Sequence, residues 1–331
     1  MEHNEILIDE EIHQVVRPVQ VNIPPMNSKR SFIEANTIEG NLDEIRHKHI
    51  IPVYANNEPL ISHSDFIDTL LSTVEDGYKG EEILPPEIRV SHPVMGRVPE
   101  AKDKRVDQLE EWEKTLYYQK MAFIIEIPSI QSTIDGNRLS LTVGGVRSFA
   151  DENLSCRNAA DQHFRFFIGF KNTVCTNLCV WTDGYLNDVR VKTIGQLKSV
   201  IKSLVENYNQ NYQLLHLSKL AEHSITEQQF AQIVGKCRMY QHLPNSTKGE
   251  ITPILFGDQQ MNMVVKDFYK DKSFCRDNNG NINLWKLFNF LTASNKSSYI
   301  DRFLDRSVNA YYFTEQIRWA LEGKGTSWYL N

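Results

Sequence analysis

Cysteine and histidine residues near the middle of the chain have the composition of a zinc site. Cys156, Cys175 and Cys179, three of the five cysteines, lie near His163 in the sequence. Structural zinc is held by four such ligands at about 2.0–2.3 Å. The usual pair of cysteines two residues apart is missing, and on one strand Cys175 and Cys179 would lie about 13 Å apart. The sequence therefore favours buried thiols, and a zinc-dependent enzyme remains a third hypothesis.

Two other patterns that could carry catalysis are incomplete. Ser148, Asp161 and His163 have the residue types of a catalytic triad, but no nucleophile elbow surrounds Ser148. The pair Gly144–Gly145 could bring backbone amides close to a phosphate, yet neither a Walker A motif nor a dinucleotide fingerprint is present. A hairpin bend or bulge is the favoured interpretation of the glycine pair. The sequence predicts no catalytic residues and no cofactor.

A strand-like segment after His163 alternates aromatic and cationic side chains. Phenylalanines at 164, 166 and 170 share one face, and the opposite face carries Arg165, Phe167 and Lys171. An aromatic ring between two cations can stack a base and hold phosphates. The alternative is an ordinary sheet whose second face is covered. The candidate nucleic-acid contacts are Arg147, Arg165, Phe167, Lys171, Arg190 and Lys192.

The overall charge limits this interpretation. The chain has a formal net charge of −6, which argues against coating nucleic acid through bulk charge alone. Residues 190–248 nevertheless contain eight Lys or Arg against three acids, so a local basic surface is compatible with the sequence.

Composition also constrains the cellular compartment. Hydrophobic residues make up 41% and charged residues 24%, as in ordinary globular proteins. The N-terminus is acidic where a signal peptide would be basic, and the longest apolar runs are only a few residues. Five cysteines without a framework pattern indicate reduced thiols. We expect a cytoplasmic protein without a membrane segment.

The elements that would position these residues begin with helices and strands in the first half. Ser62 and Asp65 form a capping box for a helix over 62–78. An apolar stripe predicts a helix over 108–122, and strand-like alternation predicts an antiparallel sheet over 120–182. Asp135–Gly136 is a strong hairpin signal.

The second half reads as helical. Helical spacing and caps predict helices at about 193–215, 224–240, 284–292 and 299–321. The expected fold is α+β, with a central antiparallel sheet backed by helices and a mostly helical C-terminal half. We expect a flexible N-terminal arm over 1–30, a sheet region over 31–189 and a helical region over 190–331. The last two form either two domains or one continuous domain.

Three blocks resemble an uncharacterised bacterial family. They are PEIRVSHPVMGRVPEAKDKRVDQLEEWEKTLYYQKMAFIIEIPSI (86–130), NTVCTNLCVWTDG (172–184) and NLWKLFNFLTASNKSSYIDRFLDRSVNA (283–310). The family is carried on prophages, plasmids and conjugative elements and is related to the phage/plasmid-like protein family, whose Cys-x-Asn element resembles Cys175–Asn177. The resemblance runs from about Ser31 to the C-terminus. It implies a mobile-element protein of the bacterial cytoplasm and assigns no activity.

Three functions follow from these observations. The first is a non-enzymatic mobile-element protein that binds or anneals single-stranded nucleic acid. The second is a protein-binding module that modulates host defence or replication factors, where an acidic surface could mimic nucleic acid. The third is the zinc-dependent enzyme, with Cys156, His163, Cys175 and Cys179 as ligands.

Overall fold

A computed structural model of the chain describes residues 31–49, 51, 60–152, 161–173 and 175–331. Residues from Ser31 to Asn331 form one compact unit. The predicted N-terminal arm over 1–30, and Cys156 of the possible zinc set, lie outside the described residues.

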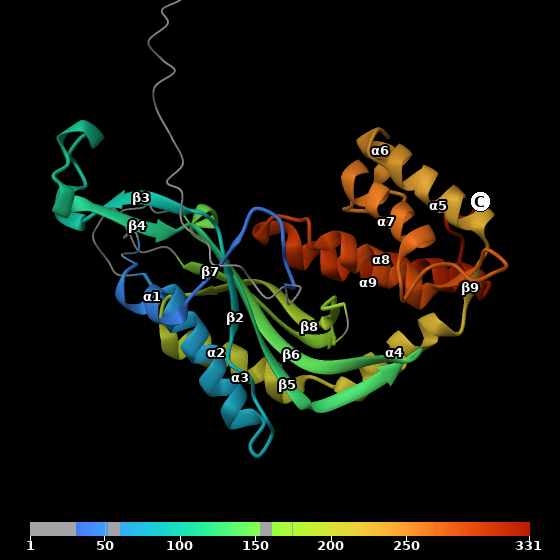
Figure 1. Cartoon of the computed structure of the whole chain (residues 1–331), viewed down its shortest axis with the longest axis horizontal. Helices are drawn as coiled ribbons and strands as arrows, with labels where there is room; N and C mark the ends of the chain where they lie inside the picture. Colours follow the sequence, from blue (N-terminus) through green and yellow to red (C-terminus); the bar gives the residue numbers. More distant parts are fainter. Residues whose placement is uncertain (1–30, 50, 52–59, 153–160, 174) are drawn as a thin grey trace, which may run out of the picture. The chain divides into compact units, whose positions relative to one another are not determined.

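The centre of this unit is a six-stranded antiparallel sheet with the strand order β1-β2-β5-β6-β7-β8 (Figure 1). Its strands are β1 (Ile38–Glu39), β2 (Glu87–Val90), β5 (Lys120–Ile134), β6 (Asn137–Ser148), β7 (Gln162–Asn172) and β8 (Leu178–Val191). The Asp135–Gly136 turn joins β5 to β6, and both of its residues have positive φ. The later half is mostly helical, which confirms the α+β class.

Nine α-helices are present in the described part of the chain. They are α1 (Leu42–His47), α2 (His63–Gly77), α3 (Ile194–Asn207), α4 (Gln210–Ala221), α5 (Glu227–Tyr240), α6 (Asn245–Lys248), α7 (Asp258–Lys270), α8 (Leu284–Asn295) and α9 (Ile300–Leu321). The capping box of Ser62 and Asp65 starts α2 as predicted. The helix predicted over 193–215 is wrong as one element, because it breaks at Tyr208 and restarts with Asn209 as the N-cap of α4. The N-cap of α5 is Thr226.

Both faces of the sheet are covered. On one face Phe66 of α2 packs against Phe123 and Phe164, with ring centroids 5.1 and 4.9 Å away. On the other face the start of α9 and residues 32–33 cover the sheet, and Phe32 meets Phe303 edge-on. The sequence did not decide whether the second face of the sheet is exposed or covered, and in the structure it is covered.

The helix predicted over residues 108–122 is wrong. Lys114–Tyr118 forms strand β4, which pairs antiparallel with β3 (Pro93–Arg97). The stripe did not mark a buried helix face, because Leu109 is buried whereas Trp112 and Leu116 are exposed. We call residues 93–118 the arm; Figure 1 shows it projecting from the end of the sheet that lies away from α7.

The predicted bend or bulge at Gly144–Gly145 is also wrong. Both glycines lie in the continuous register of β6, opposite Ile124 and Phe123 of β5. A Cβ atom on Gly145 would come within 2.4 Å of the Phe66 ring, and one on Gly144 within 2.8 Å of the Phe167 ring. The pair is needed because aromatic side chains pack directly on the strand from both faces.

Candidate functional site

Arg147, the first candidate nucleic-acid contact, is buried in the core. Its guanidinium donates to the Ile61 carbonyl and, over 2.8 Å, to Gln162 Oε1. It lies 4.4 Å from the centroid of the Phe164 ring and 3.5 Å from Glu152 Oε1. Burial raises the pKa of Glu152, and Arg147 partly opposes that shift. Arg147 therefore supports the packing of this region and does not face solvent.

The expected basic-aromatic face over residues 165–171 is not exposed. Phe167 is only 1% exposed, since it belongs to the core between the sheet and α9. Arg165 donates to the Asp301 carbonyl at 2.7 Å and lies 3.3 Å from Asp151 Oδ2. Lys171 is buried and lies 2.6 Å from Glu126 Oε2. The alternation was predicted correctly, but this strand offers no ring for base stacking in the folded protein.

Arg190 and Lys192 are the two candidates that remain on the surface. Both side chains are more than half exposed. Arg190 lies 2.8 Å from Asp188 Oδ1, and Lys192 lies 3.8 Å from Asp161 Oδ1. Each cation thus has a carboxylate neighbour, which reduces the local positive potential.

The possible zinc ligands within the described residues do not converge. His163 pairs with Arg190 at one end of the β7–β8 ladder, whereas Cys179 pairs with Phe170 near the other. Seven residues separate these positions on β7, which is about 23 Å along a strand. No three His, Cys, Asp or Glu side chains come together as a metal site among the residues that the structure describes.

His63 connects α2 to the root of the arm. Its Nε2–H donates to the Tyr118 carbonyl at 2.9 Å, and its ring stacks on Phe149 at 4.6 Å. Burial, together with the nearby Arg147 charge, lowers the pKa of His63 to about 3. The imidazole is therefore neutral in the folded protein at ordinary pH.

This pKa shift predicts a loss of stability in mild acid. Above pH 6.5, the ordinary pKa of the group, His63 is neutral in both states and its contribution is fully present. Below that pH the unfolded chain takes up a proton that the folded protein excludes, so unfolding becomes easier by about 1.4 kcal/mol per pH unit. The expected loss between pH 6.5 and 5 is about 2 kcal/mol.

Urea unfolding of the wild type and His63→Gln at both pH values measures this loss. Glutamine keeps a donor for the Tyr118 carbonyl but does not titrate. The difference between the two proteins removes the contributions of all other groups, and the pH dependence of the variant should be smaller by about 2 kcal/mol. Equal pH dependence in the two proteins would contradict the assignment.

The two faces of the arm are covered to different extents, and neither is uniformly buried or exposed. Successive side chains of a strand alternate in direction, so Tyr117 points toward Phe149 and meets its ring at 6.4 Å. The opposite side, which we call the arm face, carries the cross-strand pairs Pro93–Tyr118, Met95–Leu116 and Arg97–Lys114. It is exposed at Met95–Leu116 and covered at Tyr118, which is buried with the His49 ring 3.9 Å away. Met95 is 59% exposed and Leu116 is 53% exposed. Trp112, two residues before the start of β4, is 69% exposed.

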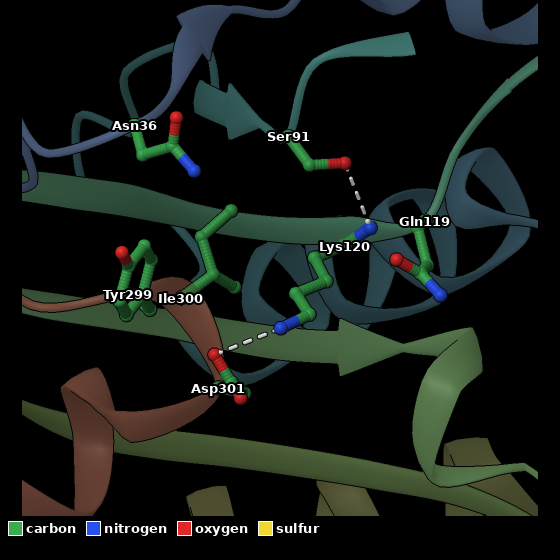
Figure 2. Close-up of a pocket in the computed structure, with 7 residues that line it drawn as sticks. All are labelled: Asn36, Ser91, Gln119, Lys120, Tyr299, Ile300 and Asp301. Carbon is green, nitrogen blue, oxygen red and sulfur yellow. Dashed lines mark hydrogen bonds and ion pairs between the residues drawn. The ribbon is translucent and has the colours of Figure 1, made fainter. Parts of the chain in front are cut away.

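A small polar pocket lies at the root of the arm, between the sheet and the start of α9 (Figure 2). Its volume is about 260 Å³, and its lining comprises Asn36, Ser91, Gln119, Lys120, Tyr299, Ile300 and Asp301. Lys120 Nζ points to Asp301 and lies 3.1 Å from its Oδ1. The backbone N–H of Lys120 donates to Ser91 Oγ. The pocket offers both charge signs and two amides, which suits a small polar group more than an apolar ligand.

Sequence reasoning missed the arm face. The signal was available in part, because both Met95 and Leu116 are apolar residues in segments rich in charged residues. What was lacking was the pairing between them, which depends on two segments about twenty residues apart.

In the described residues, no helix is long and apolar enough to cross a membrane.

Comparison with known proteins gives a family and no activity. Neither the curated proteins nor the solved structures contain a significant match to the chain. Residues 10–330 match one family, which is described as "Domain of unknown function, B. Theta Gene description (DUF3871)". This agrees with the expected uncharacterised family, and it carries no link to mobile elements. Because the match spans nearly the whole sequence, the chain belongs to the DUF3871 family.

Proposed function

We propose that the protein is a non-enzymatic protein-binding module whose contact element is the arm. One observation carries the proposal. Of the fourteen large hydrophobic side chains exposed in the described part of the chain, five belong to the arm. They are Val94, Met95, Val106, Trp112 and Leu116.

Such a concentration of apolar side chains favours a contact surface. Single exposed hydrophobic residues are common, but several gathered on one projecting element are typical of interaction sites. A two-stranded ribbon is also marginally stable alone in water. Covering the arm face would therefore stabilise the arm as well as the complex.

Binding of single-stranded nucleic acid is the second candidate. Exposed Arg190 and Lys192 support it, but their carboxylate neighbours and the burial of Phe167 make it weaker. Met95 and Leu116 are aliphatic and offer no flat ring for base stacking, so Trp112 is the exposed ring of the arm that could stack on a base. The resemblance to mobile-element proteins suggests that the partner belongs to host defence or to replication.

Co-purification from a bacterial host tests the proposed function. The double variant Met95→Ser, Leu116→Ser should lose a stoichiometric protein that the wild type retains, because it removes the centre of the arm face. Met239→Ser is the matched control, since Met239 on α5 is 58% exposed and lies outside the arm. An unchanged partner in the double variant would contradict the proposal.

The same preparations distinguish the second candidate. Fluorescence anisotropy with labelled single-stranded DNA at low and moderate salt measures nucleic-acid affinity. Salt-dependent binding that is tighter than about 10⁻⁴ M and survives the double variant would favour nucleic acid over protein.

A further inference from the structure

The arm face has a local charge opposite to that of the whole chain. Arg97 and Lys114 form its outer cross-strand pair, and none of its six residues is acidic. The chain as a whole has a formal net charge of −6. The apolar pair Met95–Leu116 is therefore bordered by cations on a protein whose net charge is negative.

Arg97 carries most of this local charge. Its guanidinium donates to the carbonyls of Lys102 and Lys104, which do not neutralise it. In the described residues no carboxylate lies within ion-pair distance of Arg97. Lys114 lies 2.5 Å from Glu111, whose side chain is 90% exposed. Such exposed pairs contribute little and exchange readily.

The spacing on β3 defines what would fit. Residues two apart on a strand are separated by about 6.6 Å, so the Met95 and Arg97 positions on the arm face have approximately this spacing. A partner would place an aliphatic or aromatic side chain on the Met95–Leu116 pair and a carboxylate on Arg97. An extended segment achieves this spacing with one residue between the two, and a helix achieves it at three or four residues apart.

Resting on the proposed function, we infer that the arm face recognises a linear acidic-apolar protein segment. In that segment a carboxylate follows or precedes an apolar side chain at strand or helix spacing. Arginine suits this role because its planar fork can bind a carboxylate through two hydrogen bonds. The chemistry of the partner is thus an acidic amphipathic peptide.

A displayed library of random twelve-residue peptides, selected on the full-length protein, tests the inference. The wild type should enrich peptides in which Asp or Glu stands at the stated spacing from Leu, Ile, Phe or Trp. Bulk charge predicts the opposite enrichment, of basic peptides, so the two effects are separable. Arg97→Glu should weaken the best enriched peptide at least about tenfold by fluorescence anisotropy. Arg190→Glu is the matched control and should leave the affinity within about twofold.

The outcomes separate the inference from the proposed function. Enrichment of acidic-apolar peptides that depends on Arg97 supports the inference. Enrichment of basic peptides overturns the inference. Peptides whose binding does not change in Arg97→Glu but disappears in the double variant Met95→Ser, Leu116→Ser also overturn it. Both results are compatible with the proposed function. If no peptides are enriched, the inference is also overturned. The proposed function is tested separately by co-purification. Arg97-dependent binding of a single-stranded DNA oligonucleotide in place of peptides would assign the arm face to nucleic acid.

Discussion

Replacing Arg147 by methionine is expected to lower the free energy of unfolding by about 3–5 kcal/mol. Methionine fills much of the same volume but removes the charge that Glu152 faces at 3.5 Å. It also removes the donors to Gln162 Oε1 and the Ile61 carbonyl. Breaking one side of a buried charged pair leaves the other uncompensated, which is why the effect is large.

Urea unfolding near pH 7 measures the loss, and a second variant isolates its origin. Glu152→Gln in the Arg147→Met background should restore part of the stability, because the orphaned carboxylate is then absent. Arg190→Met is the matched control, since Arg190 is exposed and should change the stability by no more than about 0.5 kcal/mol. A loss for Arg147→Met as small as that of the control would mean that the guanidinium is not an internal support.

The class of the fold and the alternation of its strands could be predicted from local patterns. Phe164, Phe166 and Phe170 lie in the core that α2 covers, as their spacing indicates. The helix over 62–78 was predictable because Ser62 and Asp65 carry the full capping signal. Both signals act between neighbours in the sequence, so no knowledge of tertiary structure was needed.

The arm could not be predicted because its residue pattern is compatible with both a helix and a strand. Leu109, Trp112 and Leu116 fit a helical stripe, yet Thr115, Tyr117 and Tyr118 favour a strand. The segment forms a strand because it pairs with Pro93–Arg97. The residues of the segment itself carry no information about this pairing. Tertiary pairing therefore decided the structure of this segment.

The candidate site was misplaced for a related reason. Arg165, Phe167 and Lys171 have the alternation of a strand with a polar outer face, and such a face can be open or covered. The start of α9, more than 100 residues later, covers it here. The surface that did stay open lies on the arm, whose pairing was also not visible in the sequence. Exposure of a sheet face depends on distant chain segments, so residue type alone could not locate the site.

Gly145→Val is expected to destabilise the protein by about 3 kcal/mol, the upper end of the usual range for an overfilled core. A Cβ at this position would lie 2.4 Å from Phe66 Cζ and 3.2 Å from the Arg165 carbonyl oxygen. Phe66 cannot move aside easily, because its ring is fully buried between Phe123 and Phe164. The valine must therefore displace α2 or distort β6. Urea unfolding of the variant and the wild type measures the change.

Two further variants show whether the Phe66 ring is the cause. Gly235→Val is the matched control, because a Cβ on Gly235 of α5 meets nothing within 4 Å; its stability should stay within about 0.5 kcal/mol of the wild type. Phe66→Leu creates space next to the strand, so Gly145→Val should cost less in that background, with a coupling of about 1–3 kcal/mol. If the destabilisations caused by Gly145→Val and Phe66→Leu were additive, steric conflict with Phe66 would not explain why position 145 requires glycine. A positive coupling would establish that the glycine pair lets α2 lie close enough to the sheet for Phe66 to pack on the strand itself.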